Sequence, residues 1–522
     1  MADSMTGAAI ASASPTAWPI APGPTALSPV PGARDPKLAE RIAAAIEADV
    51  LQAGWPVGKV IGSEDQLAAR YGAGRAVIRE AIRLAEHRQV VRMRRGRSGG
   101  LAVVEPDASA VTESLAIFLE YARADIDDLI EARTVLEAYS AAAAAGAHLD
   151  EGRLRVLREA ARQPLGSLAG TAGPGPGLVH QLVAEATGNA ALSLFIQVIA
   201  SLSDRLGTGT AATGSGRSSS AAAVQRRHAA IIAAIAAGDG ALAREQMRAD
   251  MSAMRKASRR LRTEPCLPEA GTVAATTVAA PGRPRPADLV AARIRRDIID
   301  RGWPVGDSLG FEADLLARYG IGRAQFREAV RILENHSVVR MQRGAAGGML
   351  VAAPDGRAVV RVVALYLTYK GMNSAHIRDL REELEAATLR MAIDRLTDDG
   401  VRRLNGVLEL ERTWPDEDFP AVSHDLHAVI AELSGNRTLA LLQSIVMQLT
   451  AERLHSGDPR RVTEPPQAVR RAHQAIVEAI IARDAPLAQR RMDKHLQAIA
   501  RWTVEGSARI RERAPETAGI IS

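Results

Sequence analysis

The sequence predicts a mainly α-helical chain in which a winged helix-turn-helix domain followed by an all-helical bundle occurs twice. The first observation is an internal repeat, since residues 55–107 return as residues 303–355 with 30 identities in 53 positions and no gap. The second is that apolar residues beyond each copy recur at three-to-four spacing, which is typical of helices. A chain of 522 residues is long enough for several cores.

The repeat and the changes in composition set the expected domain boundaries, and we name the two copies the first and the second repeat. The start of the chain is rich in Pro, Ala and Ser, and the stretch between the copies is rich in Pro, Ala and Thr. Neither holds enough apolar surface to order itself. The expected segments are a disordered tail at 1–35, a winged helix at 36–107, a helical domain at 108–258, a linker at 259–285, a second winged helix at 286–355, a second helical domain at 356–508 and a tail at 509–522.

Each winged-helix domain is expected to begin with a helix, at 38–53 in the first repeat, that ends at a glycine. Ser63 and Gln66 then form a Ser-x-x-Gln capping box that opens a short helix. A glycine-containing turn leads to a longer helix at 75–88, which gives the helix-turn-helix layout. Residues 90–104 have the pattern of two strands around a basic, glycine-rich tip, which predicts a wing.

The longer helix of each repeat carries a row of arginines. A spacing of four residues places these side chains along one helix face, and a guanidinium group can bind guanine or phosphate through two hydrogen bonds. The alternative interpretation is an ordinary solvated face, but the basic wing that follows favours double-stranded DNA. The expected contacts are Arg75, Arg79 and Arg83 in the first repeat and Arg323, Arg327 and Arg331 in the second.

A resemblance to a known family rests on residues 62–96, GSEDQLAARYGAGRAVIREAIRLAEHRQVVRMRRG. This segment is similar to the winged-helix domain of GntR-family bacterial transcription regulators in its helix lengths, its Arg-x-x-x-Arg-Glu-Ala signature and its wing. The resemblance spans residues 36–107 and 286–355. The implied base and phosphate contacts are Arg75, Arg79, Arg323 and Arg327, and the implied wing glycines are Gly96 and Gly344.

The chain departs from the family pattern at two places in each repeat. Gly74 and Gly322 stand where the family usually has Ser or Thr before the first recognition arginine, so a hydroxyl contact to phosphate is lost. Asp65 and Ala313 replace an arginine that is often found in the preceding short helix.

The two wings also differ in charge. We expect the first repeat to contribute more of the salt-dependent affinity for DNA, because a wing with more arginines neutralises more phosphates. The wing arginines are Arg92, Arg94, Arg95 and Arg97 in the first repeat and Arg340 and Arg343 in the second.

The tracts at about 108–258 and 356–505 resemble the FCD-type helical ligand domain of the FadR subfamily. In that subfamily an Asp and three His from different helices often hold a divalent metal of the Zn, Ni or Mn type. The metal and a nearby arginine bind a carboxylate ligand. The resemblance therefore implies a metal and a small-molecule effector, either a small carboxylate or an acyl-CoA-type metabolite.

In the second repeat, His427, His473 and His495 stand at the three histidine positions of the subfamily. Ser423 stands at the aspartate position. His424 lies on the same helical face as His427 and is the candidate replacement ligand. The alternative is that isolated histidines on helices are core or interface residues.

In the first repeat, His180 and His228 remain, while Asp250 replaces the last histidine and Pro176 stands at the aspartate position. These residues leave a 2-His-1-carboxylate set as a weaker candidate metal site.

Two matching arginines, Arg381 and Arg133, are the candidates for binding the carboxylate of an effector through a charge-assisted bidentate contact. Each precedes a glutamate by four residues, Glu385 and Glu137 respectively. The alternative for both arginines is an i,i+4 pair with that glutamate on the helix surface.

Composition narrows the remaining classes of function. Cys266 is the only cysteine, which excludes a disulfide framework and a multi-thiolate metal site within one chain. Aromatic residues make up only 3%, which argues against base-stacking platforms for single strands. No stretch has the pattern of a signal peptide or a membrane span, so a cytoplasmic protein with no membrane partner is expected.

The sequence thus favours a transcription regulator, not an enzyme, that binds an operator with two half-sites and acts as a repressor modulated by an effector. One chain with two DNA-binding domains is expected to act as an intramolecular pseudo-dimer. A homodimer of such chains would present four DNA-binding domains. An architectural DNA-binding protein with vestigial sensor domains stays open as an alternative. A metal-dependent hydrolase is the remote alternative, because no nucleophile elbow or His-Glu-x-x-His motif is present.

Overall fold

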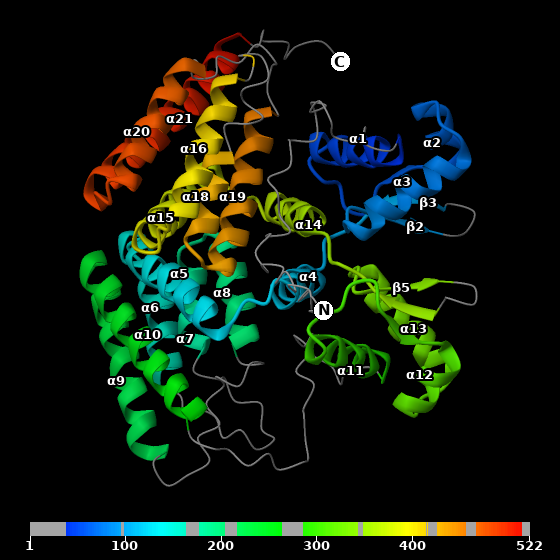
Figure 1. The fold of residues 1–522 in the computed structure, drawn as a ribbon, viewed down its shortest axis with the longest axis horizontal. Coiled ribbons are helices and arrows are strands. Elements are labelled where there is room, and N and C mark those ends of the chain that lie inside the picture. The colour runs from blue at the N-terminus through cyan, green and yellow to red at the C-terminus, as the bar shows by residue number, and fades with distance from the viewer. Residues whose placement is uncertain are drawn as a thin grey trace, which may run out of the picture.

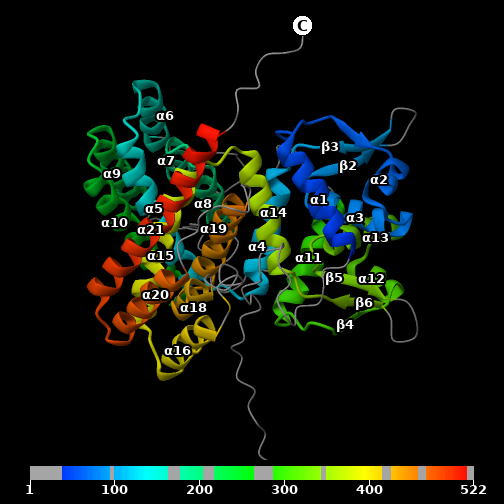
Figure 2. The same ribbon diagram turned by 90° about the horizontal axis from the view of Figure 1, so that it is seen from above.

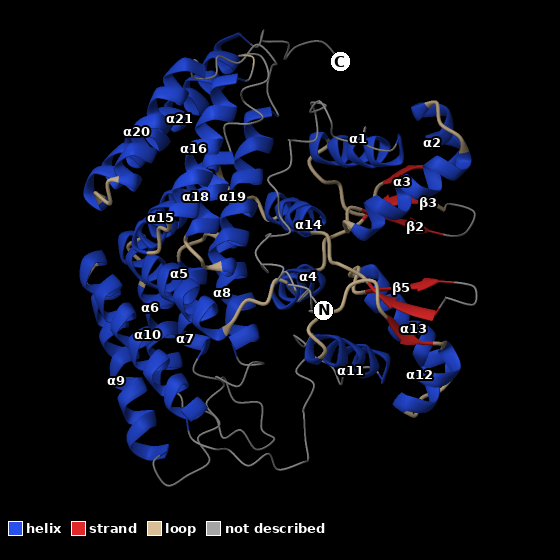
Figure 3. Cartoon of the chain, viewed as in Figure 1, coloured by secondary structure: helices blue, strands red, loops and turns tan. Residues whose placement is uncertain are grey.

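In the computed structural model, two winged-helix domains lie on one side and two helical bundles on the other (Figure 1). The structure describes residues 38–94, 99–162, 177–203, 217–263, 286–342, 348–413, 415, 425–455 and 466–513. Among these residues helices dominate, and the strands form two small three-stranded sheets (Figure 3). The prediction of a mainly α chain with two winged helices and two helical bundles is confirmed.

The first winged-helix domain has the predicted order of elements. They are α1 (Leu38–Gln52), β1 (Val60–Gly62), α2 (Glu64–Tyr71), α3 (Arg75–His87), β2 (Val91–Arg94) and β3 (Gly100–Val103). The antiparallel sheet has the order β1-β3-β2, and Val91 lies opposite Val103. The β2–β3 hairpin is the wing.

The second winged-helix domain repeats these elements at the same offset. They are α11 (Pro286–Asp300), β4 (Ser308–Gly310), α12 (Glu312–Tyr319), α13 (Arg323–Asn335), β5 (Val339–Gln342) and β6 (Gly348–Val351). The sheet order β4-β6-β5 matches that of the first domain, with Val339 opposite Val351.

Local chemistry accounts for the start and end of α2. The Ser63 side chain accepts a hydrogen bond from the Gln66 backbone N–H, and the Gln66 side chain accepts one from the Ser63 backbone N–H, which is the predicted capping box. Gly72 ends the helix in the left-handed conformation, with φ of 60°. In α12 the corresponding N-cap residue is Phe311, and no side-chain cap forms.

The two helical bundles lie side by side and have matching helix orders. The first contains α4 (Ala108–Tyr121), α5 (Ile126–Gly146), α6 (Glu151–Arg162), α7 (Gly177–Ala186), α8 (Ala190–Ser203), α9 (Arg217–Ala236) and α10 (Gly240–Thr263). The second contains α14 (Gly356–Tyr369), α15 (Ser374–Asp394), α16 (Asp398–Thr413), α18 (Asp425–Leu433), α19 (Arg437–His455), α20 (Pro466–Ile481) and α21 (Ala485–Arg513). The last helix of each bundle thus extends past the expected domain ends at 258 and 508, into the segments expected as linker and tail.

The two repeats are connected by a crossed arrangement in which each winged helix packs on a helix of the other repeat. Figures 1 and 2 show α14 beside α1 and α4 beside α11. The ring centroids of Trp55 and Tyr369 are 5.4 Å apart, and those of Trp303 and Tyr121 are 5.5 Å apart. These two pairs occupy matching positions, so the two interfaces are related by a pseudo-two-fold axis.

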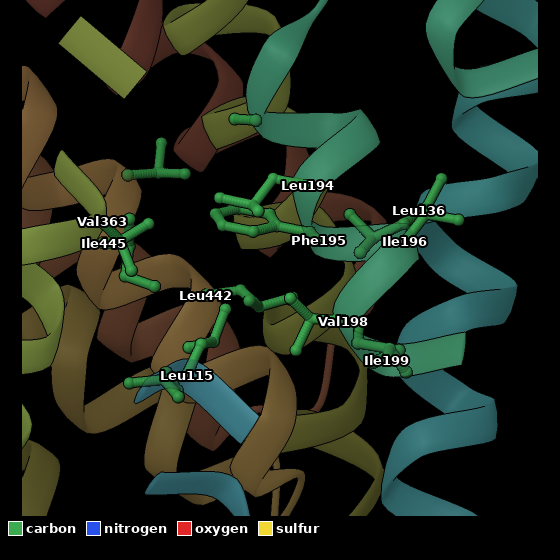
Figure 4. Close-up of a cluster of buried hydrophobic side chains, with 14 of the residues drawn as sticks. Leu115, Leu136, Leu194, Phe195, Ile196, Val198, Ile199, Val363, Leu442 and Ile445 are labelled. Atoms are coloured by element: carbon green, nitrogen blue, oxygen red, sulfur yellow. The ribbon is translucent and has the colours of Figure 1, made fainter. Parts of the chain in front are cut away.

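A hydrophobic core shared by the two bundles holds them together. Figure 4 shows side chains from both repeats in one cluster, with Leu115 and Phe195 of the first repeat near Val363 and Leu442 of the second. Phe195, Leu115 and Val363 are fully buried. Burial of this much apolar surface between the repeats makes the pairing a part of the fold.

Two matching asparagines connect the bundles further. The Asn436 side-chain N–H₂ donates to the backbone oxygen of Asp128 at 3.0 Å, and that of Asn189 donates to the backbone oxygen of His376 at 3.3 Å. Each asparagine also caps its own helix, through a side-chain oxygen that accepts from a backbone N–H. The polar contacts therefore obey the same pseudo-symmetry as the aromatic ones.

Among the described residues no helix is both long and apolar enough to cross a bilayer.

Candidate functional site

The recognition helix of the first repeat, α3, exposes its arginines and buries its opposite face. The side chains of Arg75, Arg79 and Arg83 are 69%, 64% and 73% exposed. Ile78 and Ala81 on the other face are fully buried in the domain core. An exposed basic face on a helix anchored by its apolar face can enter the major groove.

Each of these three arginines has an acidic neighbour. Arg79 Nε lies 2.5 Å from Glu64 Oε1, and Arg75 Nε lies 3.0 Å from Asp65 Oδ1, so both contacts reach back to α2. Arg83 pairs with a glutamate one turn away on α3. Exposed pairs of this kind contribute little to stability and can exchange for phosphate.

The recognition helix of the second repeat, α13, has the same exposed arginine row. Arg323, Arg327 and Arg331 are all exposed, and Arg331 Nη2 lies 2.9 Å from Glu328 Oε1. The position of Asp65 is taken by Ala313, so the carboxylate that contacts Arg75 has no counterpart here.

The wings of both domains lie on the side of the molecule away from the bundles (Figures 1 and 2). Among their arginines, Arg92, Arg94 and Arg340 are exposed on the strands. The remaining predicted wing residues lie outside the described part of the chain; they are Arg95, Gly96, Arg97, Arg343 and Gly344.

In the second repeat the structure brings the three predicted histidines together. His427 on α18, His473 on α20 and His495 on α21 are buried, and their ligating atoms lie within 4.8 Å of one another. The Nε2 atom of His495 lies 3.3 Å from that of His427 and 3.2 Å from that of His473. We name these residues the three-histidine cluster.

Two buried carboxylates orient the cluster. Glu385 Oε2 lies 2.5 Å from His427 Nδ1, and Glu411 Oε1 lies 2.8 Å from His473 Nδ1. With Nδ1 occupied in this way, each ring presents Nε2 to the centre of the cluster. A carboxylate behind a ligating histidine is the usual support of a metal ligand.

The protonation states also suit a metal. Burial and, to a smaller extent, the neighbouring histidines lower the pKa of His495 to about 2. Burial also lowers the pKa of His427, although Glu385 opposes this effect. Neutral imidazole is the form that binds metals, and three nitrogens each about 2.0–2.1 Å from one ion lie roughly 3–3.5 Å apart. The Nε2 separations of the three-histidine cluster therefore fit a bound divalent ion.

In the first repeat the predicted 2-His-1-carboxylate residues also meet. His180 Nε2 lies 3.1 Å from His228 Nε2 and 3.2 Å from Asp250 Oδ2. Arg227 Nε, however, lies 2.5 Å from Asp250 Oδ1, so this carboxylate already has a cationic partner. Glu137 contacts His180 Nδ1, as Glu385 contacts His427 in the second repeat.

The first-repeat cluster also differs in protonation. Burial lowers the pKa of His180, but the carboxylates of Glu137 and Asp250 outweigh burial and raise this pKa to about 9. The two carboxylates therefore favour the protonated form of His180, which has no free lone pair for a metal. Burial and the charge on His180 lower the pKa of His228 to about 4.

The candidate effector-binding arginines are buried beside these clusters. Arg381 Nε lies 2.6 Å from Glu385 Oε1, and Arg133 Nε lies 2.7 Å from Glu137 Oε1. The i,i+4 pairs expected as the alternative do form, but the expectation of a surface location was wrong, since both arginines are about 5% exposed. Among the described residues, Arg381 Nη2 has no hydrogen-bond partner and is available to an anion.

Some residues of this site could not be identified from the sequence. Glu411 and Arg227 carry no signal in the sequence, because each acts on its histidine or aspartate from a distant helix. The candidate ligand His424 and the aspartate-position residues Ser423 and Pro176 lie outside the described part of the chain.

Comparison with family models decides the assignment. The model "Bacterial regulatory proteins, gntR family" matches residues 38–100 and 286–347, and the model "FCD domain" matches residues 128–253 and 376–498. The chain belongs to the GntR family. It is a tandem GntR-family transcription regulator, in which two DNA-binding domains each precede a ligand-sensing FCD domain.

Individual relatives cover one repeat at a time. The chain is 27% identical over 228 residues to the HTH-type transcriptional repressor NanR of Cronobacter sakazakii, a match that spans 42% of this chain and 86% of the relative. It is 25% identical over 231 residues to NanR of Salmonella typhimurium, across 43% and 87% of the two chains. Among solved structures, a Streptococcus agalactiae GntR protein matches with 21% identity and a TM-score of 0.32, across 41% of this chain and 99% of that one.

Proposed function

We propose that this GntR-family regulator is a metabolite-responsive repressor in which one chain binds both half-sites of an operator. The observation that carries the proposal is that a single polypeptide holds two exposed recognition-helix arginine rows, on α3 and α13, in domains related by a pseudo-two-fold axis. Two-fold related readers match an operator with two half-sites. The similar NanR proteins are named repressors, which supports this sign of regulation.

The second repeat supplies the sensor in this proposal. His427, His473 and His495 would hold a divalent ion of the Zn, Ni or Mn type, which when bound supplies a Lewis-acidic centre for an anionic oxygen. Arg381 Nη2, buried without a hydrogen-bond partner among the described residues, supports a carboxylate-bearing effector such as a small organic acid or an acyl-CoA-type metabolite.

A path of packed helices connects this sensor to the first winged-helix domain. The cluster lies on helices that pack on α15, which packs on α19, and α19 packs on α14. Tyr369 at the end of α14 contacts Trp55 of the first winged helix. An effector that favours one placement of these helices would therefore change the relative placement of the two readers and weaken operator binding.

A fluorescence-anisotropy titration tests the DNA-binding part of the proposal, with the DNA upstream of the protein's own gene as the first probe. We expect tight, salt-dependent binding by the wild type, and loss in both Arg75→Ala/Arg79→Ala and Arg323→Ala/Arg327→Ala. The mass of the complex should correspond to one chain per operator. Binding no tighter than to random DNA, followed by failure of a random-sequence selection, would refute the regulator assignment.

A second candidate is an architectural DNA-binding protein with vestigial sensors. The pairing of Asp250 with Arg227 and the protonated state of His180 favour this for the first repeat. A thermal-shift screen of small carboxylates and acyl-CoA esters discriminates, because a ligand of the native state raises the melting temperature. Metal-free protein with no shift for any compound would favour the architectural role, and turnover that follows metal content would instead indicate a hydrolase.

A further inference from the structure

The two crossed interfaces carry the same ion pair with its charges exchanged. In the first interface, Glu47 of α1 meets Arg361 of α14, with Arg361 Nη2 2.7 Å and Nε 2.9 Å from Glu47 Oε2. In the second, Arg295 of α11 contacts Glu113 of α4. Residue 295 matches residue 47, and residue 361 matches residue 113, since both pairs are 248 residues apart, as are Trp55 and Trp303.

Both central side chains are buried, so their charges matter. Glu47 is fully buried, and Arg88 of its own domain is a second cationic neighbour. The Arg295 side chain is 14% exposed, and its Nε lies 3.3 Å from Glu120 Oε2. A buried charge that loses its partner, or gains a like charge, strongly disfavours the complex that contains it.

We infer that this exchange of charges makes the first repeat pair only with the second and prevents either repeat from pairing with a copy of itself. Two first repeats in the same geometry would set Glu47 against Glu113 and Glu120, three carboxylates around Arg88. Two second repeats would set Arg295 against Arg361. Pairing of a first repeat with a second repeat places opposite charges together at both interfaces.

This assignment identifies the partner that fits the crossed surface, namely the opposite repeat. It also excludes a second copy of the same repeat as the partner at this surface. The aromatic pairs cannot discriminate in this way, because Trp55 and Tyr121 are matched by identical residues, Trp303 and Tyr369.

The test uses the full chain with a protease site inserted between residues 264 and 285. The protein is cleaved, unfolded in urea and refolded, and native mass spectrometry then counts the pairs, since the two halves differ in mass. For the wild type we expect unlike pairs to exceed like pairs by at least about tenfold. Like pairs near the random share in the wild type would overturn the inference.

An exchange variant removes the discrimination while keeping the ion pairs. Glu113→Arg/Glu120→Thr/Arg295→Glu/His336→Arg gives the second interface the residues found at the matching positions of the first. Each repeat then becomes complementary to itself as well, so like pairs should rise toward the random share. A pair distribution unchanged from the wild type would show that these charges do not select the partner.

A single substitution at Glu113 gives an independent test of the pairing. Glu113→Arg sets two arginines together in the unlike pair but makes the first repeat complementary to itself through Glu47. Pairs of two first repeats should therefore increase while pairs of two second repeats should not. Equal increases in both would contradict the assignment. A Glu409→Arg variant on the exposed face of α16 serves as the control for an added charge.

Discussion

The Nδ1 atom of His473 lies 2.8 Å from Oε1 of Glu411, and both side chains are buried in the second helical domain. This contact holds the ring so that Nε2 faces the other two histidines of the cluster. Replacing Glu411 by glutamine keeps the size of the side chain but removes its charge. We expect Glu411→Gln to weaken divalent-metal affinity by about 10- to 100-fold, measured by competition with a chromogenic chelator. Glu409→Gln, an exposed change on the same helix, should leave the affinity unchanged. Equal metal affinity of both variants would show that Glu411 does not support the metal site.

Metal content should distinguish the two repeats. Burial lowers the pKa of His427 and His495 in the three-histidine cluster, whereas in the first-repeat cluster two carboxylates raise the pKa of His180 and Arg227 holds Asp250. We therefore expect about one metal ion per chain by elemental analysis of protein purified without chelators. His473→Ala should abolish this content, and His228→Ala at the matching position should leave it intact. Two ions per chain, or loss in both variants, would contradict this assignment.

Salt dependence should show which wing binds DNA more strongly. The sequence of the first wing includes Arg94, Arg95 and Arg97, and that of the second includes Arg343 in the matching stretch. Each lost phosphate contact lowers the slope of log affinity against log salt by roughly one. We expect Arg94→Ala/Arg95→Ala/Arg97→Ala to reduce the slope more than Arg343→Ala does, in anisotropy titrations at several salt concentrations. Equal slopes for the two variants would refute the unequal contribution of the wings.

Asp128 gives a pH dependence of stability that is independent of the metal. Burial and, to a smaller extent, the charge of Asp125 raise the pKa of its carboxyl to about 6. The folded state therefore binds a proton more tightly than the unfolded chain, whose aspartates titrate near 3.9. The resulting loss of stability is complete above the folded pKa, shrinks as the pH falls through about 6, and is absent below about 4.

We accordingly expect Asp128→Asn to stabilise the protein by up to about 3 kcal/mol at pH 7.5, since a shift of about two pKa units corresponds to this free energy. This gain should disappear near pH 4, as measured by urea unfolding at each pH. Asp398→Asn, an exposed change in the first turn of α16, should give no such pH-dependent gain. A constant gain for Asp128→Asn at all pH values would point to a packing effect instead of titration.

The local structure could be predicted because its causes lie close together in the chain. Ser63 and Gln66 cap α2 across three residues, and the arginine row of α3 follows from its spacing of four. The histidines could be proposed only through the family resemblance, since His427 and His495 are 68 residues apart and share no local pattern.

The remaining features depend on contacts between distant segments. Glu47 and Arg361 are 314 residues apart, and nothing in either neighbourhood shows that a winged helix packs on the opposite repeat. The same holds for Arg227, whose contact with Asp250 closes the first-repeat cluster. A surface pair with Glu385 was the alternative to the predicted effector contact of Arg381, because the spacing of four residues is that of an exposed pair. Only the packing of neighbouring helices shows that both side chains are buried.

The packing of α4 against α14 within one polypeptide has a consequence for gene control. For a regulator that must first dimerise, the concentration of the active dimer falls with the square of the chain concentration when chains are scarce, because two chains must meet. In the proposed complex of one chain with one operator, both DNA-binding domains arrive together, so operator occupancy would fall only in proportion to the number of chains. A few molecules per cell can then suffice for control. Each recognition helix is also encoded separately, so one can change its DNA sequence preference while the other keeps its own. Such a chain can recognise operators whose two half-sites differ in sequence.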